Sequence, residues 1–367
     1  MTGPRPVRLL VFCGATRWGG AEILLGHLLA ALPERFETSL LGVDAAVLTR
    51  IAARRPGTAW TTVPRVASMR DLPAIWAHRR AMAKARPDVL HLNLPVPFSD
   101  PYSVLAALTL RRTPVIAVEH LPMPTRFPRT ERIVRATAPH LSAIVGVSES
   151  AARQIERLVD LQPGAVRVIP NGVPKPKELS PISTPRGGPV VGAVGRFDHQ
   201  KGFDLLLSAV AELPGVHLVL VGDGPERPAL EQLVADLRLG PRVSLLGWSD
   251  DASGYLRSFD VLAMPSRYEG LPLTLLEAMR SGVAIVATRV GGIPDAVEDG
   301  ESALLIPPDD VAALTAALRR LTEDPVLRRR LGAAAQRDGG HRFTVEEMAR
   351  TYEALYDDVL STRSSPR

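Results

Sequence analysis

The sequence predicts an α/β protein with two doubly wound domains, each a mostly parallel sheet covered by helices. The chain has 367 residues, 46% of them hydrophobic, and this length exceeds the usual size of one hydrophobic core. Short β-branched or leucine-rich runs alternate with helical patterns along both halves, as in βαβ units. The alternation stops at residues 174–189, which are rich in Pro, Ser and Gly, and then resumes. We therefore expect two domains joined by a linker.

The first half contains the apolar runs that we expect to form one sheet. The expected strands are 7–12, 38–43, 89–92, 115–118, 144–147 and 166–169, with helices at 21–31 and 72–84. The only cysteine, Cys13, adjoins the first strand, so an internal disulfide is excluded and a buried thiol in a reducing compartment is expected. The apolar stretch near the N-terminus lasts about six residues, too short for a signal peptide.

The second half repeats the pattern after the linker. The expected strands are 190–194, 216–221, 243–245, 261–264 and 284–287, with helices at 203–211, 229–237 and 274–279 and further helical sequence after Val311. A last amphipathic helix is expected at 344–360. The predicted domains are thus 1–173 and 190–343, with a linker at 174–189 and a terminal segment at 344–367. Two such domains leave a cleft, and doubly wound sheets bind ligands at the carboxyl ends of their strands.

Charge is distributed unevenly along the chain. Residues 1–180 carry 24 Lys and Arg against 13 Asp and Glu, a net +11, whereas residues 181–367 carry 20 against 26, a net −6. Basic clusters in the first half occur at 50–55, 79–86 and 126–135. They suit anionic lipid head groups or phosphorylated acceptors, and equally a solvated arginine-rich surface. Nucleic acid fits these clusters less well, because aromatic residues, only 5% of the chain, do not interleave with them.

The segment GAVGRFDHQKGFDLLLSAV carries the first candidate chemistry. It places Arg196 and Lys201 in the loop between a buried strand and an amphipathic helix. Arg196 offers a planar fork for two phosphate oxygens and Lys201 a point charge. Gly202 permits close backbone approach, and the next helix adds its positive N-terminal end. A diphosphate is the ligand expected here, although two solvated loop cations are the simpler interpretation of this segment alone.

The second candidate segment is MPSRYEGLPLTLLEAMRSGVAIVATRVGGIPDAV. Pro272 suits the first turn of a helix, so Glu269 is expected in the preceding loop and Glu277 one turn inside the helix. The two carboxylates then address two parts of one ligand, with the backbone amides of Gly270 and Leu271 between them. That arrangement suits a sugar nucleotide. A helix-dipole role would explain Glu277 alone.

At this point the chain resembles a known family, the retaining glycosyltransferases of family 4, also called glycosyl transferases group 1, which have the GT-B architecture of two Rossmann-like domains. The segments that carry the resemblance are spread in order along most of the chain. They are GGAE at 19–22, VGVSES at 145–150, VIPNGV at 168–173, VGRFDHQKGFDLLL at 194–207, LVGDGPERPALE at 220–231, LLGWSDD at 245–251 and YEGLPLTLLEAM at 268–279. The last segment contains the family's Glu-x7-Glu signature.

The resemblance implies roles for individual residues. Arg196 and Lys201 hold the donor diphosphate, Glu269 binds hydroxyls of the transferred sugar, Glu277 binds the ribose, and His120 lies near the reaction centre. The resemblance also implies that the terminal helix crosses back onto the first domain, whereas an amphipathic helix packed on its own domain has the same sequence pattern. Further donor-binding positions that it implies are Gly19, Gly20, Gly222, Gly247, Gly270 and Leu271.

No cofactor and no metal is expected, because the sequence lacks an Asp-x-Asp motif or a histidine cluster in a loop. Asp250 and Asp251 are adjacent and suit the start of a helix. Arg196, Lys201 and backbone amides must then balance the charge on the departing diphosphate, and loss of either cation is expected to cost about 3 kcal/mol, roughly a hundredfold in rate. The resemblance suggests a front-side displacement in which the leaving phosphate accepts the acceptor's proton.

The expected function is therefore metal-independent, retaining transfer of a hexose-type sugar from a nucleotide-sugar, with UDP as the default nucleotide, to a hydroxyl acceptor. The acceptor is a lipid-linked cell-envelope glycan precursor or a small natural product, and the loop at 121–132 is expected to help bind it. Alternatives are a nucleotide-sugar 2-epimerase of the same fold and an inactive nucleotide-sugar-binding protein. We expect a cytoplasmic protein, either soluble or peripheral to the inner membrane face, and a GC-rich bacterial source.

Overall fold

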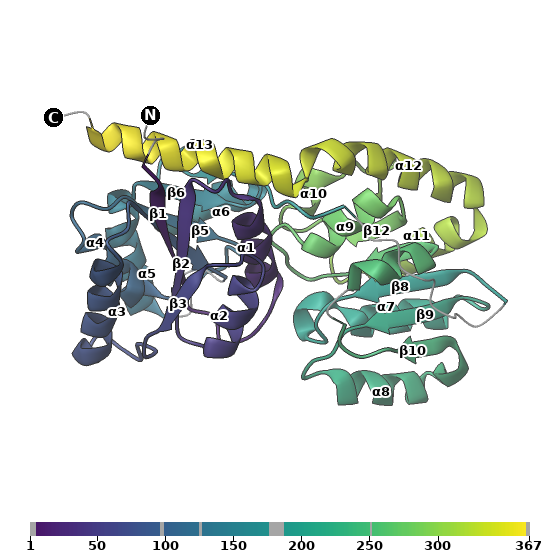
Figure 1. Cartoon of the computed structure of the whole chain (residues 1–367). Coiled ribbons are helices and arrows are strands. Elements are labelled where there is room, and N and C mark those ends of the chain that lie inside the picture. Colours follow the sequence, from purple (N-terminus) through teal and green to yellow (C-terminus); the bar gives the residue numbers. More distant parts are fainter. Residues whose placement is uncertain (1–4, 96–98, 125–126, 176–186, 250–251, 365–367) are drawn as a thin grey trace. The chain divides into compact units, whose positions relative to one another are not determined.

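The computed structural model describes residues 5–95, 99–124, 127–175, 187–249 and 252–364. It consists of two compact units (Figure 1). Unit 1 comprises Met1–Gly172 and Val345–Arg367, and unit 2 comprises Val173–Thr344. The linker expected at 174–189 lies largely outside the described residues.

Unit 1 contains a seven-stranded parallel sheet in the order β3-β2-β1-β4-β5-β6-β7. Its strands are β1 Val7–Cys13, β2 Phe36–Gly42, β3 Ala59–Thr62, β4 Val89–Leu94, β5 Val115–Glu119, β6 Ala143–Gly146 and β7 Arg167–Val168. Its helices are α1 Gly20–Ala31, α2 Ala45–Ala52, α3 Leu72–Ala85, α4 Pro101–Leu108, α5 Pro128–Thr137, α6 Glu149–Val159 and α13 Val345–Ser364. The central strands are buried on both faces, which is why they appear in the sequence as continuous apolar runs.

Helix α13 belongs to unit 1 although its sequence follows unit 2 (Figure 1). Tyr356, fully buried, bonds to Nδ1 of His91 on β4 at 2.8 Å and meets Phe36 edge to face. Arg35 donates to carboxylates of α13, at 2.9 Å to Glu353 and 2.7 Å to Asp357. The terminal helix thus crosses back to the first domain, as the resemblance implied.

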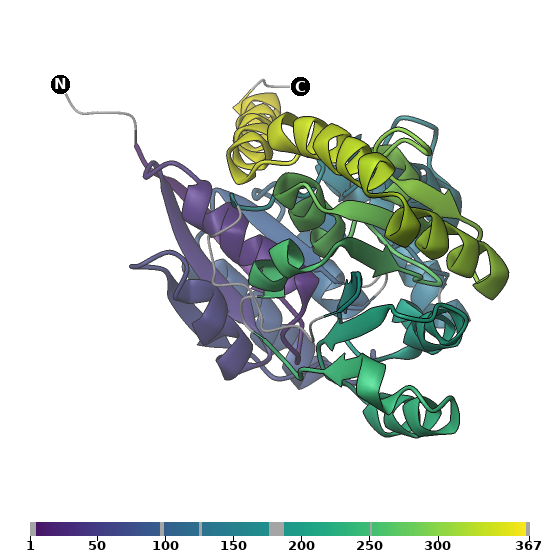
Figure 2. The same ribbon diagram turned by 90° about the vertical axis from the view of Figure 1, so that its right-hand side faces the viewer.

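Unit 2 contains a six-stranded parallel sheet in the order β10-β9-β8-β11-β12-β13, with helices on both of its faces (Figure 1, Figure 2). Its strands are β8 Val190–Val194, β9 His217–Val221, β10 Val243–Leu245, β11 Val261–Met264, β12 Ala284–Thr288 and β13 Leu304–Ile306. Its α-helices are α7 Phe203–Ala211, α8 Arg227–Asp236, α9 Leu273–Ser281, α10 Ile293–Ala296, α11 Val311–Glu323 and α12 Pro325–Arg342. Both sheets reverse strand order beside their first strand, the position where doubly wound folds bind ligands, so the predicted fold class is confirmed.

Several details differ from the sequence prediction. The segment 121–132 is only partly loop, because Pro128 occupies the first turn of α5, where its fixed φ favours a helix. Pro272 is the N-cap of α9, one position before the first turn in which it was expected. Strand β3 was not predicted, because all four of its residues are exposed and no apolar run marks it. Cys13 ends β1 as a buried free thiol, as expected, and burial raises the pKa of this thiol to about 12.

Candidate functional site

In unit 2, the loop after β8 brings Lys201 over a glycine. A side chain at Gly195 would place its Cβ 3.3 Å from Cε of Lys201, so the lysine stem lies against this backbone. Gly202, at φ +63°, follows Lys201 and approaches the carbonyl oxygen of Pro265 so closely that a Cβ there would be 2.3 Å away. Arg196 is partly exposed, with its Nε 3.7 Å from Oδ2 of Asp198. The loop therefore presents two cations without a shared partner.

Glu269 and Lys201 form a direct ion pair. Nζ of Lys201 lies 2.6 Å from Oε1 of Glu269, and the two side chains are 20% and 5% exposed. Ser266 donates to the same oxygen at 2.8 Å, and Gln200 donates to Oε2 at 3.3 Å. From the sequence, these two charges were expected to bind different parts of a ligand. In the structure they also hold each other, which fixes both at the carboxyl end of β8 and β11.

The backbone after Glu269 is held by a second glycine turn. Gly292 donates its N–H to the carbonyl of Gly270 at 2.6 Å. Gly291, at φ +52°, comes so close to the carbonyl oxygen of Glu269 that a Cβ there would be 1.9 Å away. Leu271 is buried, and half-buried Glu277 lies in α9, so the two glutamates occupy a loop and a helix as predicted.

The predicted donor-binding glycines Gly222 and Gly247 lie at the same sheet edge. Gly222 has φ +146°, and a Cβ there would be 1.8 Å from the carbonyl oxygen of Gly195. Its N–H donates to the carbonyl of Gly247 at 2.8 Å. Gly247 has φ +76° with open space where a Cβ would be. The backbone thus brings three predicted segments together around Gly195.

Unit 1 places Gly19 and Gly20 at the start of α1. Gly19 is the N-cap and Gly20 the first helical residue. Beside them the buried carboxyl group of Glu22 lies near the amides of this turn, and burial raises the pKa of Glu22 to about 7. Sequence analysis assigned Glu22 no role, although it is the last residue of the GGAE segment.

His120 lies at the carboxyl end of β5, half-buried. Its Nε2 is 2.8 Å from Oδ1 of Asn93 on β4. With that oxygen as acceptor the ring donates from Nε2, so Nδ1 is left as an acceptor. Burial lowers the pKa of His120 to about 4, which keeps the ring neutral. The arrangement suits acceptance of a hydrogen bond from a ligand hydroxyl.

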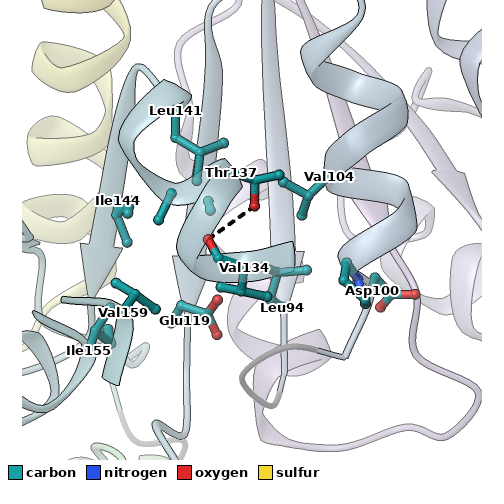
Figure 3. A pocket seen from close by; sticks show the side chains of 13 residues that line it. Leu94, Asp100, Val104, Glu119, Val134, Thr137, Leu141, Ile144, Ile155 and Val159 are labelled. Carbon is teal, nitrogen blue, oxygen red and sulfur yellow. Dashed lines mark hydrogen bonds between the residues drawn. The ribbon is translucent and has the colours of Figure 1, made fainter. Parts of the chain in front are cut away.

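Two acidic residues not predicted from the sequence, Glu119 and Asp100, line one cavity of unit 1. Glu119 ends β5 and lines a cavity whose other walls are mostly apolar side chains (Figure 3). Asp100 is the N-cap of α4, and a Cβ at Gly14 would meet its carboxylate at 2.1 Å. Burial, followed by the charge of Asp100, raises the pKa of Glu119 to about 8. The one sequence signal for Glu119 was its position next to His120.

The basic clusters of the first half are partly structural. Arg55 donates to four backbone carbonyls, those of Leu29, Leu32, Pro33 and Phe36. Arg50 stacks on Trp18 and Arg135 pairs with Glu131. Arg126, Asp250 and Asp251 lie outside the described residues. Within the described ranges, no group of three His, Cys, Asp or Glu is placed to hold a metal ion.

Family models match both units. The model for Glycosyltransferase Family 4 matches residues 18–175, and that for Glycosyl transferases group 1 matches residues 188–324. The lipopolysaccharide core biosynthesis glycosyltransferase LpsE of Rhizobium meliloti is 32% identical over 363 residues, 95% of this chain and 96% of that protein. The chain belongs to glycosyltransferase family 4. It is therefore a glycosyltransferase, and the resemblance inferred from its motifs is confirmed.

Other relatives of this glycosyltransferase match less of the chain or only its fold. The 2-deoxystreptamine glucosyltransferase of Streptomyces kanamyceticus is 35% identical over 205 residues, about half of each protein. The crystal structure of Anabaena Alr3699/HepE in complex with UDP superposes with a TM-score of 0.83, covering 96% of this chain and all of that one. At 23% identity this likeness shows the shared GT-B fold.

Proposed function

We propose that the enzyme transfers a hexose-type sugar from UDP to a hydroxyl acceptor, with retention at the anomeric carbon and without a metal ion. The observation that carries the proposal is the Lys201–Glu269 pair, 2.6 Å apart at the end of the unit 2 sheet. A cation for phosphate and a carboxylate for sugar hydroxyls meet there, as a sugar diphosphate requires. UDP is the nucleotide of choice because the HepE structures contain UDP and UDP-glucose.

In this proposal the chain's own groups replace a metal at the diphosphate. Arg196 and Lys201 balance the charge that develops on the leaving oxygen, with the N-terminal end of α9 and the amides of Gly270 and Leu271 beside them. Glu277 binds the ribose, and the close backbone contacts at Gly222 and Gly247 leave room for the nucleotide. Arg196 is partly exposed next to this tightly packed turn, which leaves its guanidinium accessible to a ligand.

Retention follows in this scheme from a front-side displacement. The acceptor oxygen forms a bond to the anomeric carbon while the bond from that carbon to the β-phosphate oxygen breaks, and the acceptor's proton passes to that phosphate oxygen. Neutral His120 accepts a hydrogen bond from a hydroxyl near the reaction centre rather than supplying charge. A family 4 transferase is favoured over a nucleotide-sugar 2-epimerase or an inactive binding protein, because LpsE matches along nearly the whole chain.

The test is calorimetric titration with UDP-, GDP- and ADP-sugars in the presence of EDTA, using the parent, Arg196→Ala and Glu277→Ala. We expect UDP-sugar binding that both variants weaken at least tenfold. To test retention, the enzyme is incubated with the donor and mixtures of candidate acceptors, and NMR of the anomeric proton gives the configuration of the product. Unchanged binding in both variants, or an absolute need for metal, would refute the donor site proposed here.

We also propose that unit 1 works at the cytoplasmic face of an anionic membrane. Helix α3 exposes Leu72 and Trp76, at 67% and 56%, on one face, and Arg80 stacks on Trp76 at 5.2 Å. Six Lys or Arg occur between residues 60 and 86 against one acid, Asp71. Exposed tryptophan flanked by arginine is typical of helices that lie in a lipid interface. Among the described residues no helix is long and apolar enough to cross a membrane.

Vesicle sedimentation tests the membrane proposal. The parent should bind vesicles of phosphatidylcholine with phosphatidylglycerol and not vesicles of phosphatidylcholine alone, since each basic residue near an anionic surface contributes about 1 kcal/mol. The double variant Leu72→Ser, Trp76→Ser should lose binding. The control is Val326→Ser, a residue of unit 2 that is also 67% exposed. Equal sedimentation of the parent and the double variant would exclude α3 as the contact.

A further inference from the structure

A small cavity in unit 1 lies between the sheet and helices α4, α5 and α6. Its volume is about 30 Å³, which admits about two water-sized groups. Apolar side chains such as Val104, Val134 and Ile155 form most of its wall (Figure 3). The cavity is therefore too small for a sugar ring but large enough for a single functional group and the carbon that carries it.

Glu119 points its carboxyl group into this cavity (Figure 3). The residue is only 7% exposed, and its Oε2 has no hydrogen-bond partner within the described part of the chain. A buried carboxyl oxygen that accepts no hydrogen bond lowers the stability of the fold by about 1 to 3 kcal/mol. Such an oxygen usually marks a place where a ligand or a water molecule donates the hydrogen bond. An adjacent donor is missing, and a ligand can supply it.

The charges around the cavity determine which functional group of a ligand it can bind. Asp100 is near enough to raise the pKa of Glu119 further, and burial raises the pKa of Asp100 itself. Arg65 is the cation that acts on Asp100. The wall residues contributed by α5 and α6 are uncharged, and neighbouring His120 is neutral. The titratable groups that line the cavity are thus both acids, Glu119 buried and Asp100 half-buried, which disfavours a phosphate and favours a cation.

We infer that Glu119 binds a primary ammonium group of the acceptor in this cavity, so that the acceptor is an aminopolyol such as an amino sugar rather than a phosphorylated sugar. The inference rests on the proposed function, because it assigns the acceptor of that transfer. The ammonium group supplies the missing donor to Oε2, and its carbon contacts the apolar wall. His120 follows Glu119 in the chain, so the cavity lies at the same end of β5 as the group proposed for the reaction centre.

Proton linkage gives the inference a specific signature. Near neutral pH, Glu119 is largely protonated because its pKa is about 8. An ammonium group stabilises the ionised carboxylate, so binding expels that proton. A neutral polyol that occupied the cavity would release none. Calorimetry at neutral pH in two buffers of different ionisation enthalpy measures the number of protons released.

The probes are three matched compounds that differ at C1: D-glucamine, with a primary amine, D-glucitol, which is neutral, and D-glucitol 1-phosphate. Each is titrated into the protein saturated with UDP. We expect D-glucamine to bind at least tenfold more tightly than the other two and to release about one proton, as the loss of one charged hydrogen bond implies. Glu119→Gln should remove both the preference and the proton release.

The control variant is Glu149→Gln, whose carboxylate is 64% exposed on α6; it should bind like the parent. Equal or tighter binding of D-glucitol or its phosphate overturns the inference, as does unchanged D-glucamine binding in Glu119→Gln, or no D-glucamine binding at all. UDP is titrated first into every protein. If the parent fails to bind UDP, the proposed function itself fails; if UDP binds and the amine preference is absent, only the assignment of Glu119 fails.

Discussion

The Lys201–Glu269 pair permits a test that separates the two halves of the donor. Lys201 should contact the diphosphate and Glu269 the sugar, although in the structure they contact each other at 2.6 Å. UDP contains the first half and lacks the second. Lys201→Met should therefore weaken UDP and UDP-glucose alike, whereas Glu269→Gln should weaken UDP-glucose and leave UDP unchanged or bound more tightly.

The magnitudes follow from the number and kind of contacts. A hydrogen bond to a charged group contributes about 1.5 to 3 kcal/mol, which is roughly a 10- to 150-fold change in affinity. Lys201→Met should lose that factor for both ligands. Glu269→Gln keeps an oxygen for Ser266 and Lys201 but removes the negative charge beside the phosphates. For this variant the affinity ratio of UDP-glucose to UDP should fall by roughly the same factor.

Calorimetry with both ligands on both variants measures this ratio. The control is Arg330→Met, since Arg330 and Glu301 form an exposed ion pair of unit 2 with 3.6 Å between charged atoms. It should change neither affinity. If Glu269→Gln loses as much affinity for UDP as for UDP-glucose, Glu269 does not bind the sugar, and its role is to position Lys201.

Three further outcomes are expected. Gly222→Ala should lower the thermal unfolding temperature and weaken UDP binding, because φ is +146° and the new Cβ would lie 1.8 Å from a carbonyl oxygen; Gly240→Ala, where a Cβ meets nothing within 4 Å, should change neither. Tyr356→Phe should lower the stability of unit 1 by about 1 to 3 kcal/mol in urea unfolding, because it leaves Nδ1 of buried His91 without its 2.8 Å partner; equal stability would show that water replaces the hydroxyl. Glu119→Gln should gain stability relative to the parent as pH rises from about 4.5 to about 8, because over that interval Glu119 of the unfolded parent loses its proton while the folded protein keeps it. A pH-independent difference would contradict the raised pKa.

The sequence predicted the strands of unit 2 best. Strands 190–194, 243–245 and 261–264 have the predicted bounds, because parallel strands buried on both faces are continuous apolar runs. Strand β3, at the edge of the unit 1 sheet, was not predicted because all four of its residues are exposed and form no apolar run. The strand orders could not be predicted from pattern alone, since every parallel strand looks alike in sequence.

For the candidate site, the sequence indicated which residues take part, but it did not indicate which of them contact one another. Lys201 and Glu269 are 68 positions apart, and only the fold shows that they pair. Glu119 was not predicted because it directly follows the apolar run 115–118, which indicates only a strand. Its cavity depends on helix α4, which precedes it in the chain, and on helices α5 and α6, which follow it. A buried acid has no sequence signature; its environment is a property of the packed structure.

The charge of a segment and the charge of its binding site are set by different parts of the structure. The first 180 residues carry a net +11, yet the titratable groups that line the cavity at the end of β5 are the acids Glu119 and Asp100. Many of these arginines are committed elsewhere: Arg55 caps backbone carbonyls, Arg35 anchors α13 and Arg80 covers Trp76 on the outer face of α3. Solvated cations on an outer face attract an anionic surface through long-range fields, whereas a buried carboxylate selects its ligand at contact distance. A basic domain that discriminates against phosphorylated acceptors is therefore physically consistent, and an acceptor carried by an anionic membrane with an amine near its reactive hydroxyl would use both features.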